Sequence, residues 1–205
     1  MLALTDPRAA SIEELFRAAG ALRAGHFALK SGRHSDLYLE KFAVLQYPLL
    51  AVEIGRRLAD ALEPYQPSLV VGPTTGGALL ALETARQLEA RLGRTVRGIF
   101  AEPMERGERA LRRGWPIADD ERVVLVDDIL TTGASLAETV AAVRAAGAEP
   151  LAAAVIVDRS TGSVEIGCPI VALGRIEIGS WEIADCGLCA AGHPAVKPGS
   201  SAPPA

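Results

Sequence analysis

Between residues 69 and 157, short apolar runs alternate with longer segments rich in alanine and leucine. The apolar runs cover residues 69–71, 96–100, 123–126 and 151–157, and the segments 78–92 and 136–146 have the composition of helices. Strands without polar alternation are buried on both faces, so this rhythm predicts an α/β fold with a mostly parallel sheet flanked by helices. Such sheets bind ligands at the carboxyl ends of their strands. We therefore expect the functional site just after Val71, Val126 and Val157.

Two helices are expected before the sheet. Ser11 and Glu14 have the spacing of a capping box, and apolar residues at helical spacing follow, so a first helix should run to about Arg23. Pro48 should open a second helix that ends near Pro64. The chain has 205 residues, 49% of them hydrophobic, which suffices for one domain with a small appended lobe.

The charge balance argues against several classes of partner. The chain carries 21 basic and 25 acidic residues, a net charge of −4, so it offers no positive field for nucleic acid or an anionic membrane. No apolar run approaches the ~20 residues of a membrane span, and the first residues lack the pattern of a secretory signal. Three cysteines do not form a disulfide framework. We expect a cytoplasmic protein with a small-molecule ligand and no nucleic-acid or membrane partner.

Two segments interrupt the strand and helix pattern. Residues 101–114 contain seven charged residues and two glycines, and we expect an exposed mobile loop that is either a lid or a solvated connection. The residues after Gly192 are rich in Pro, Ala, Gly and Ser, which predicts a tail that is frayed at its end.

Residues 123–135 read VVLVDDILTTGAS and combine a buried strand, two adjacent acids and a loop that opens a helix. Carboxylates at a strand end accept hydrogen bonds from vicinal ribose hydroxyls. The backbone N–H groups of residues 131–135, at the positive end of a helix, are suited to a phosphate, and Gly133 lets the backbone come close. The alternative for each feature alone is an acidic turn followed by an ordinary Thr/Ser helix cap.

This string resembles the signature of the type I phosphoribosyltransferases, whose substrate is phosphoribosyl pyrophosphate (PRPP). The resemblance implies their fold, a central mostly parallel sheet flanked by helices with a small N-terminal hood. It implies one domain over residues 1–205, with the hood in about 1–45, the core in about 50–160 and a flexible tail in about 193–205. Asp127 and Asp128 would be catalytic and bind the ribose 2′ and 3′ hydroxyls. The resemblance also assigns Ile129 and Leu130 to PRPP binding. The residues assigned to the 5′-phosphate are Thr131, Thr132, Gly133, Ala134 and Ser135.

Residues 25–38, GHFALKSGRHSDLY, resemble the N-terminal hood of orotate phosphoribosyltransferase. That resemblance implies orotate as the base, bound by Lys30, Thr131 and Arg159, with Tyr38 and Leu39 beside the ring. An arginine fork suits orotate because its carboxylate and carbonyl oxygens accept paired N–H bonds. Read without the family, Lys30 is a solvated turn lysine and Arg159 belongs to a surface Asp–Arg turn.

The loop GPTTGG, residues 72–77, resembles the pyrophosphate loop of the same family and implies PRPP contacts from Thr74 and Thr75. The family also leads us to expect a cis peptide between these two threonines. Some members carry a lysine in this loop, where this chain has Gly76.

Residues 101–114 correspond to a mobile segment that closes over the neighbouring subunit's site in related enzymes, which implies a homodimer. Lysine is expected in this segment, but this chain offers arginines instead. Arg109 and Arg112 are expected to act in catalysis, and Arg106 and Arg113 to bind PRPP. Arginine does not readily release a proton, so charge stabilisation of the leaving group is favoured over acid catalysis.

The reaction implied is orotate plus PRPP giving orotidine 5′-monophosphate and pyrophosphate, in pyrimidine biosynthesis, with Mg²⁺ bound mainly through PRPP. The alternatives are a phosphoribosyltransferase for another base and a non-catalytic, PRPP-sensing regulator. No residue is assigned as a metal ligand. Cys186 and Cys189, with His193 and Cys168, would make a zinc site, but one CxxC is half of such a site, and His26 and His34 receive no role.

Overall fold

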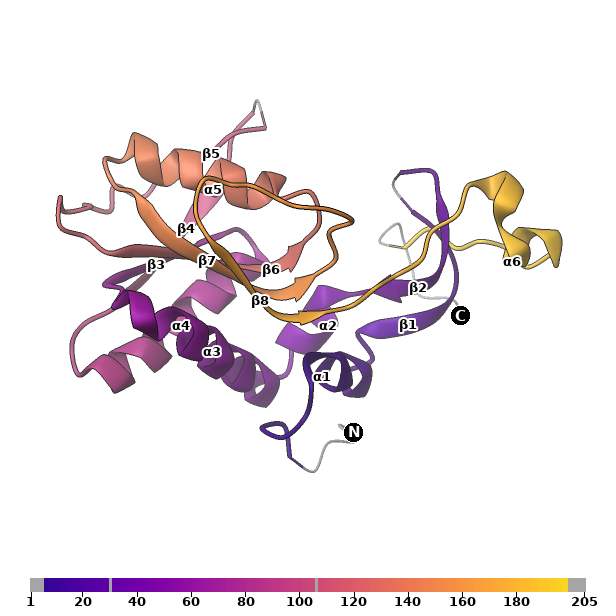
Figure 1. Ribbon diagram of the computed structural model, residues 1–205, viewed down its shortest axis with the longest axis horizontal. Helices are drawn as coiled ribbons and strands as arrows, with labels where there is room; N and C mark the ends of the chain where they lie inside the picture. The colour runs from indigo at the N-terminus through magenta and orange to yellow at the C-terminus, as the bar shows by residue number, and fades with distance from the viewer. Residues whose placement is uncertain (1–5, 30, 106, 199–205) are drawn as a thin grey trace.

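A computed structural model describes residues 6–29, 31–105 and 107–198 of the chain (Figure 1). Its centre is a six-stranded sheet in the order β5-β4-β3-β6-β7-β8. The strands are β3 (Leu69–Pro73), β4 (Arg97–Pro103), β5 (Arg109–Ala110), β6 (Val123–Leu130), β7 (Pro150–Asp158) and β8 (Ile170–Arg175). All neighbouring pairs are parallel except β4 and β5. The predicted mostly parallel sheet is confirmed.

Helices cover both faces of this sheet, α5 (Ala134–Ala145) on one side and α3 (Pro48–Leu62) with α4 (Gly76–Leu92) on the other (Figure 1). Alternate residues of β6 therefore face different helices. Val124 and Val126 belong to the core cluster that contains α3 and α4, whereas Val123 and Leu125 pack with α5. Burial on both faces is the physical reason that the strands read as unbroken apolar runs.

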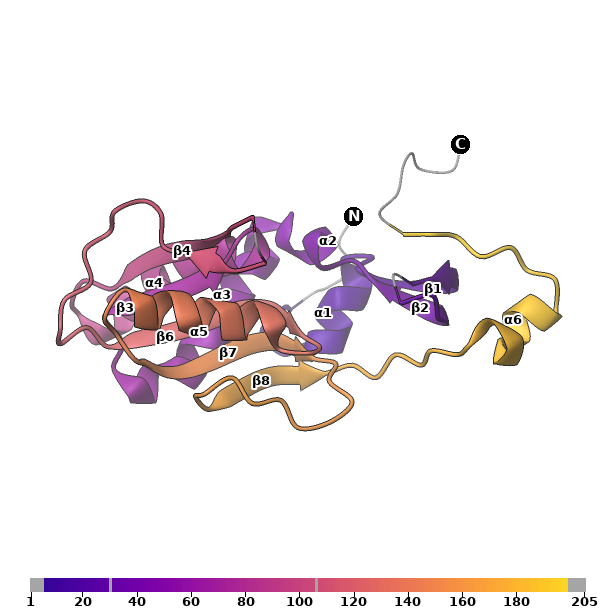
Figure 2. The same ribbon diagram turned by 90° about the horizontal axis from the view of Figure 1, so that it is seen from above.

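A smaller lobe, the hood, precedes the sheet and lies beside it (Figure 2). It consists of α1 (Ile12–Ala18), an antiparallel hairpin of β1 (Leu22–Ala28) and β2 (His34–Leu39), and α2 (Lys41–Leu45). The first helix ends five residues earlier than the expected Arg23. Gly20 takes a left-handed φ of +65°, which ends the helix, and the residues after it gain more by pairing with β2 than by continuing it.

The expectation that residues 101–114 form an exposed loop is wrong in part. Strand β4 continues to Pro103 and pairs with β5, with Glu102 opposite Ala110 and Pro103 opposite Arg109. Ala101 is fully buried. The sequence pattern did not predict the β4–β5 hairpin, because few of its side chains are buried and many are charged.

The residues after β8 return along the hood and include η2 (Ile183–Asp185) and α6 (Gly187–Ala190). Trp181 exchanges two backbone hydrogen bonds with His34 at one edge of the hairpin, both 2.8 Å. At the other edge, the N–H of Val196 donates to His26 O at 2.8 Å and the N–H of Ala28 donates to Val196 O at 2.9 Å. Val196 is thus held against β1, because the hairpin edge offers unpaired backbone groups. It falls in the expected flexible tail, of which residues 199–205 lie outside the described residues.

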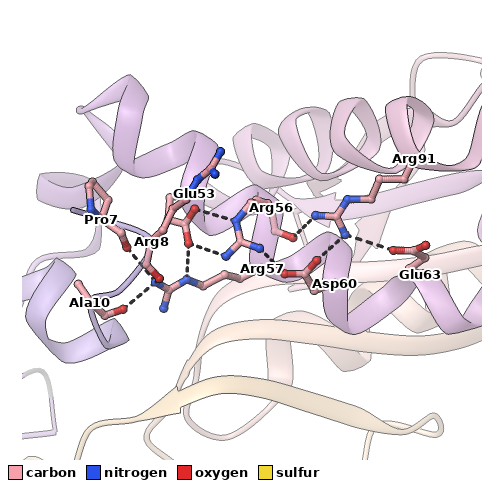
Figure 3. A network of polar contacts seen from close by, with 9 residues as sticks. All are labelled: Pro7, Arg8, Ala10, Glu53, Arg56, Arg57, Asp60, Glu63 and Arg91. Atoms are coloured by element: carbon pink, nitrogen blue, oxygen red, sulfur yellow. Dashed lines mark hydrogen bonds and ion pairs between the residues drawn. The ribbon is translucent and has the colours of Figure 1, made fainter.

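An arginine network joins the N-terminal residues to α3 and α4 (Figure 3). Glu53 is buried and accepts hydrogen bonds from Arg56 and Arg57, and Arg57 also donates to the carbonyls of Pro7 and Ala10. Burial disfavours the charge of Glu53, but the two arginines outweigh it and hold its pKa below the usual value. Among the described residues, none of the helices combines the length and apolar character that a membrane span requires.

Candidate active site

Asp127 and Asp128 lie on β6 near its carboxyl end, and both side chains are buried. The N–H of Asp128 donates to Asp127 Oδ1 and the N–H of Ile129 donates to Asp128 Oδ1, each at 2.8 Å. These bonds fix the two carboxylates at the strand end. The sequence predicted this placement of the acid pair, and the structure agrees.

Lys41, the first residue of α2, reaches the acid pair from the hood. Its Nζ lies 3.0 Å from Asp128 Oδ1 and 2.9 Å from Asp128 Oδ2. The second contact lacks hydrogen-bond geometry, so Oδ2 is buried without a hydrogen bond among the described residues. The acid pair therefore carries one nearby positive charge and retains one oxygen for a ligand.

Gly76, at the start of α4, packs directly against the same carboxylate. A Cβ atom at this position would lie 2.0 Å from Asp128 Oδ2. Glycine fits here because, in this geometry, any side chain would have to displace the acid.

Burial and, after it, the charge of the adjacent Asp128 raise the pKa of Asp127 to about 7, against the lowering influence of the Asp128 backbone N–H, Lys41 and Ser135. Two acids placed side by side in a buried site do not both ionise freely. Near neutral pH, Asp127 is therefore poised between accepting and donating a hydrogen bond to a ligand hydroxyl.

Asp127→Asn is expected to stabilise the fold at alkaline pH. The folded state raises this pKa from 3.8 to about 7, so the ionised carboxylate destabilises the fold above pH 7, and that penalty disappears as the pH falls toward 4. In urea unfolding at pH 8, the variant should exceed the parent by roughly 1–3 kcal/mol, and the difference should shrink as the pH falls and vanish near pH 4. Exposed Asp120→Asn is the control and should show no such pH dependence. A parent more stable than Asp127→Asn at pH 8 would contradict this assignment.

The loop between β6 and α5 forms a helix mouth beside the acids. Gly133 is the N-cap of the 12-residue α5, with a φ of +80°, and Thr131, Thr132 and Ala134 are exposed. The first N–H groups of a helix have no partner within it, and the helix dipole favours negative charge there. The phosphate cradle at residues 131–135 stays a prediction, and this helix start is compatible with it.

The loop after β3 adjoins this mouth through the contact of Gly76 with Asp128. The expected cis peptide between Thr74 and Thr75 is present. A Cβ atom on Gly72 would lie 2.1 Å from the carbonyl oxygen of Gly77, so the loop folds tightly back on the start of α4. Thr74 N–H donates to Ala101 O at 3.0 Å, which anchors the loop to β4.

A cavity of about 770 Å³ opens between the hood and the carboxyl ends of β6 and β7. Its lining residues are Ala28, Leu29, Ser31, Tyr38, Thr131, Thr132, Arg159, Thr161, Lys197 and Pro198. The volume suits a small organic ligand. Tyr38 lies here as expected, whereas Leu39 is wrongly assigned to the ring, because alternation along β2 turns it into the core.

Arg159 supplies the cavity with an unsatisfied donor. Its Nε is buried and has no hydrogen-bond partner among the described residues, and burial lowers the pKa of its guanidinium, against a smaller opposing influence of Tyr38. A buried donor without a partner costs about 1–3 kcal/mol, so its position at a cavity wall points to a ligand acceptor. Arg159 and Thr131, two of the three predicted base contacts, are brought together. The third, Lys30, lies outside the described residues.

The arginines of residues 101–114 point elsewhere in this structure. Arg109 Nε lies 3.3 Å from Glu138 Oε2 on α5, and Arg113 forms a 2.7 Å ion pair with Glu102. Arg112 is exposed beside Met104 and Glu105, and Arg106 lies outside the described residues. Within the described residues, Arg109, Arg112 and Arg113 therefore form no ion pair with the acid pair, and their expected roles at pyrophosphate stay predictions.

Lys41 is the site residue that sequence reasoning missed. A signal was present in the composition, because only three of the 21 basic residues are lysines, at positions 30, 41 and 197. Lys41 contacts the acid pair and Lys197 lines the cavity. Two of the three lysines of a chain that otherwise uses arginine thus lie at the candidate site.

Comparison with known proteins first identifies the class to which this chain belongs. Residues 43–187 match the family model of the phosphoribosyl transferase domain. The chain therefore contains a phosphoribosyltransferase domain, as the acid pair and helix mouth indicated.

Individual relatives identify the family within this class. The chain is 41% identical to orotate phosphoribosyltransferase of Caldanaerobacter subterraneus over 91% of this chain and 95% of that one. It is 43% identical to the enzyme of the same name from Pelotomaculum thermopropionicum, over 92% and 96%. Solved orotate phosphoribosyltransferases share the fold. The Mycobacterium tuberculosis protein with inorganic phosphate has a TM-score of 0.64 at 25% identity over 82% and 95%, and the Aeropyrum pernix protein 0.58 at 26% over 80% and 93%. The chain belongs to the orotate phosphoribosyltransferase family.

Proposed function

We propose that this chain transfers the 5-phosphoribosyl group of PRPP to orotate, giving orotidine 5′-monophosphate and pyrophosphate in de novo pyrimidine biosynthesis. The observation that carries the proposal is the buried Nε of Arg159, which has no partner among the described residues and lines the cavity next to Thr131. The names of the relatives support the same reaction.

The cavity selects an anionic base with several acceptors. Orotate carries a carboxylate and ring carbonyls that satisfy an arginine fork, whereas uracil and hypoxanthine lack the carboxylate. The Thr131 hydroxyl and the ring of Tyr38 provide a polar and an aromatic wall. A base without the carboxylate would leave the Arg159 donor buried and unpaired, which disfavours its binding.

The sugar phosphate is held by the neighbouring acids and helix mouth. The 5′-phosphate is placed at residues 131–135, where backbone N–H groups face it, and the vicinal hydroxyls are placed at Asp127 and Asp128. Departure of pyrophosphate leaves positive charge on the ribose ring, and the carboxylates, fixed in advance by backbone hydrogen bonds, stabilise that charge. Orotate attacks as an anion, so positioning and electrostatics dominate over base catalysis.

Mg²⁺ is proposed to enter bound mainly through the oxygens of PRPP. Two buried carboxylates fit a hard cation near the diphosphate, and Asp128 Oδ2 lacks a hydrogen bond among the described residues. When bound, Mg²⁺ supplies positive charge that stabilises the leaving pyrophosphate.

We also propose that the protein works as a homodimer in which residues 101–114 of each subunit reach the partner's site. Arg109 and Arg113 form ion pairs with Glu138 and Glu102 and not with the acid pair of their own subunit. Exposed apolar side chains on α3 and α4, among them Leu49 at 74% and Leu82 at 67%, provide a surface that favours association. We propose the cytoplasm as the compartment, because Cys168, Cys186 and Cys189 are all unpaired thiols.

A base-specificity assay tests the proposal against its alternatives. The purified protein is incubated with PRPP and Mg²⁺ and with orotate, uracil, hypoxanthine or adenine in turn, and pyrophosphate release is measured. We expect turnover with orotate only. Faster turnover with another base would identify a different phosphoribosyltransferase, and binding of PRPP without turnover of any base would identify a non-catalytic sensor.

Arg159→Lys is expected to weaken orotate binding selectively. Lysine keeps the charge but loses the planar fork, so the KM for orotate should rise roughly 10- to 100-fold while the KM for PRPP changes little. Initial rates with each substrate varied in turn measure both constants. Arg175→Lys, at the end of the neighbouring β8, is the matched control and should leave both unchanged. A rise of less than threefold in the KM for orotate would remove Arg159 from the base site.

A further inference from the structure

Four potential metal ligands meet in the hood, away from the acid pair and the cavity. His26 lies on β1, His34 opens β2, and Cys186 and Cys189 lie at and within α6, which lies beside the hairpin (Figures 1 and 2). Their ligand atoms all lie within 4.8 Å of one another. His26, His34 and Cys186 are buried.

The separations of these atoms approach those of a tetrahedral site, and two of them are shorter. His26 Nε2 lies 2.8 Å from His34 Nδ1, 3.4 Å from Cys186 Sγ and 3.6 Å from Cys189 Sγ, and His34 Nδ1 lies 3.1 Å from Cys189 Sγ. A zinc ion with bonds of about 2.1 Å to nitrogen and about 2.3 Å to sulfur separates its ligand atoms by about 3.3–3.8 Å. A shift of a few tenths of an ångström would therefore admit the ion.

One of the histidines is oriented from behind in the manner of a metal ligand. His26 Nδ1 lies 2.8 Å from the carbonyl oxygen of His193, an acceptor, so Nδ1 carries the proton and donates it. The lone pair of Nε2 then faces the two sulfurs and His34. Hydrogen bonds of this kind fix the tautomer and ring orientation of metal-binding histidines.

We propose that His26, His34, Cys186 and Cys189 bind one Zn²⁺ ion in a structural site. Two thiolates and two neutral imidazoles form the Cys₂His₂ set of structural zinc, and four protein ligands leave no open position for catalysis. The proposed site keeps the two cysteines of the CxxC from the sequence hypothesis and replaces its other two ligands with His26 and His34. His193 contributes only its backbone carbonyl to the orientation of His26, and Cys168 packs in the separate core cluster that contains α5.

The ion would tie the hairpin to the returning C-terminal segment. Trp181, which pairs with His34, precedes the two cysteines in the chain. After the cysteines the chain reaches Val196, which pairs with β1, and then Lys197 and Pro198, which line the cavity. Metal binding therefore holds one wall of the cavity in place. This consequence for orotate rests on the proposed function, whereas the metal site itself does not.

Metal analysis of the full-length protein, purified without chelators or metal-affinity resin from cells grown with zinc, tests the proposal. We expect one zinc per chain. The double variant Cys186→Ser/Cys189→Ser should lose at least nine-tenths of it, and the matched control Cys168→Ser should keep it. A second pair, His34→Ala and His193→Ala, should separate in the same way, because His193→Ala retains the backbone carbonyl.

Stability and cobalt binding make the test independent of whether variants fold. Removal of zinc from the parent protein by a chelator should lower its unfolding midpoint by roughly 10 °C, and added zinc should restore it. Cobalt(II) added to the zinc-free parent should produce the thiolate-to-metal absorption of a tetrahedral site with two sulfurs. Absence of zinc together with no cobalt spectrum, or a Cys186–Cys189 disulfide in freshly purified protein, would overturn the proposal.

Activity distinguishes this inference from the proposed function. Zinc removal should raise the KM for orotate several-fold more than the KM for PRPP, because the displaced wall belongs to the base cavity. A protein that binds one zinc but does not turn over orotate would refute the function and leave the metal site standing. A protein that turns over orotate without binding zinc or cobalt would refute the metal site and leave the proposed function standing.

Discussion

Asp128→Asn should lower kcat/KM for PRPP about 1,000-fold, a loss of about 4 kcal/mol of transition-state stabilisation. Asparagine has nearly the same shape, so it fits against Gly76, but it removes the negative charge that faces Lys41 and the developing positive charge on the ribose. Asp127→Asn should cost less, because burial already raises the pKa of Asp127 to about 7 and leaves it partly neutral.

Initial rates at saturating orotate with PRPP varied measure this effect. The exposed Asp120→Asn removes one negative charge outside the site and should leave kcat/KM within twofold of the parent. Circular dichroism and the unfolding midpoint confirm that Asp128→Asn remains folded. A loss below threefold for Asp128→Asn would mean that the acid pair does not face the reacting sugar.

Gly133→Ala should damage both the fold and the phosphate site. The residue has a φ of +80°, and a Cβ atom would lie 2.3 Å from Val164 Cγ1. Left-handed backbone costs alanine about 1 kcal/mol, and displacement of Val164 adds more, so the free energy of unfolding should fall by roughly 2–4 kcal/mol. Because the helix mouth must move to relieve the contact, the KM for PRPP should rise about 100-fold.

The other end of the same helix provides a matched control. Gly147 has a φ of +91°, but a Cβ atom there would meet nothing within 4 Å. Gly147→Ala should therefore cost only the backbone strain, about 1 kcal/mol, and leave the KM for PRPP unchanged. Urea unfolding and PRPP kinetics on both variants separate strain from crowding. Equal destabilisation by the two substitutions would contradict the close packing of Gly133 against Val164.

The sheet and the acid pair were accessible to sequence reasoning because both depend on local patterns. Residues 123–126 are apolar without interruption since both faces of β6 are covered, and the polar string that follows must then lie at the strand end. The left-handed conformation of Gly133 and the burial of Asp127 and Asp128 come from the structure.

The contacts that escaped prediction join segments far apart in the chain. Lys41 meets Asp128 across 87 positions, and His26 meets Cys186 across 160. Periodicity reports which face of an element is buried, not which distant element covers it. The hairpin of residues 22–39 was missed for a related reason, since the capping box at Ser11 marks where α1 starts but only Gly20 marks where it stops.

One site is expected to hold the activated sugar by both its ring hydroxyls and its 5′-phosphate. A crystal structure of this protein with PRPP and Mg²⁺ tests it most directly. We expect the 5′-phosphate oxygens within hydrogen-bond distance of the backbone N–H groups of Thr132, Gly133 and Ala134, and the ribose hydroxyls on Asp127 and Asp128. Electron density that places the phosphate outside this helix mouth, with both acids free of the sugar, would contradict the account.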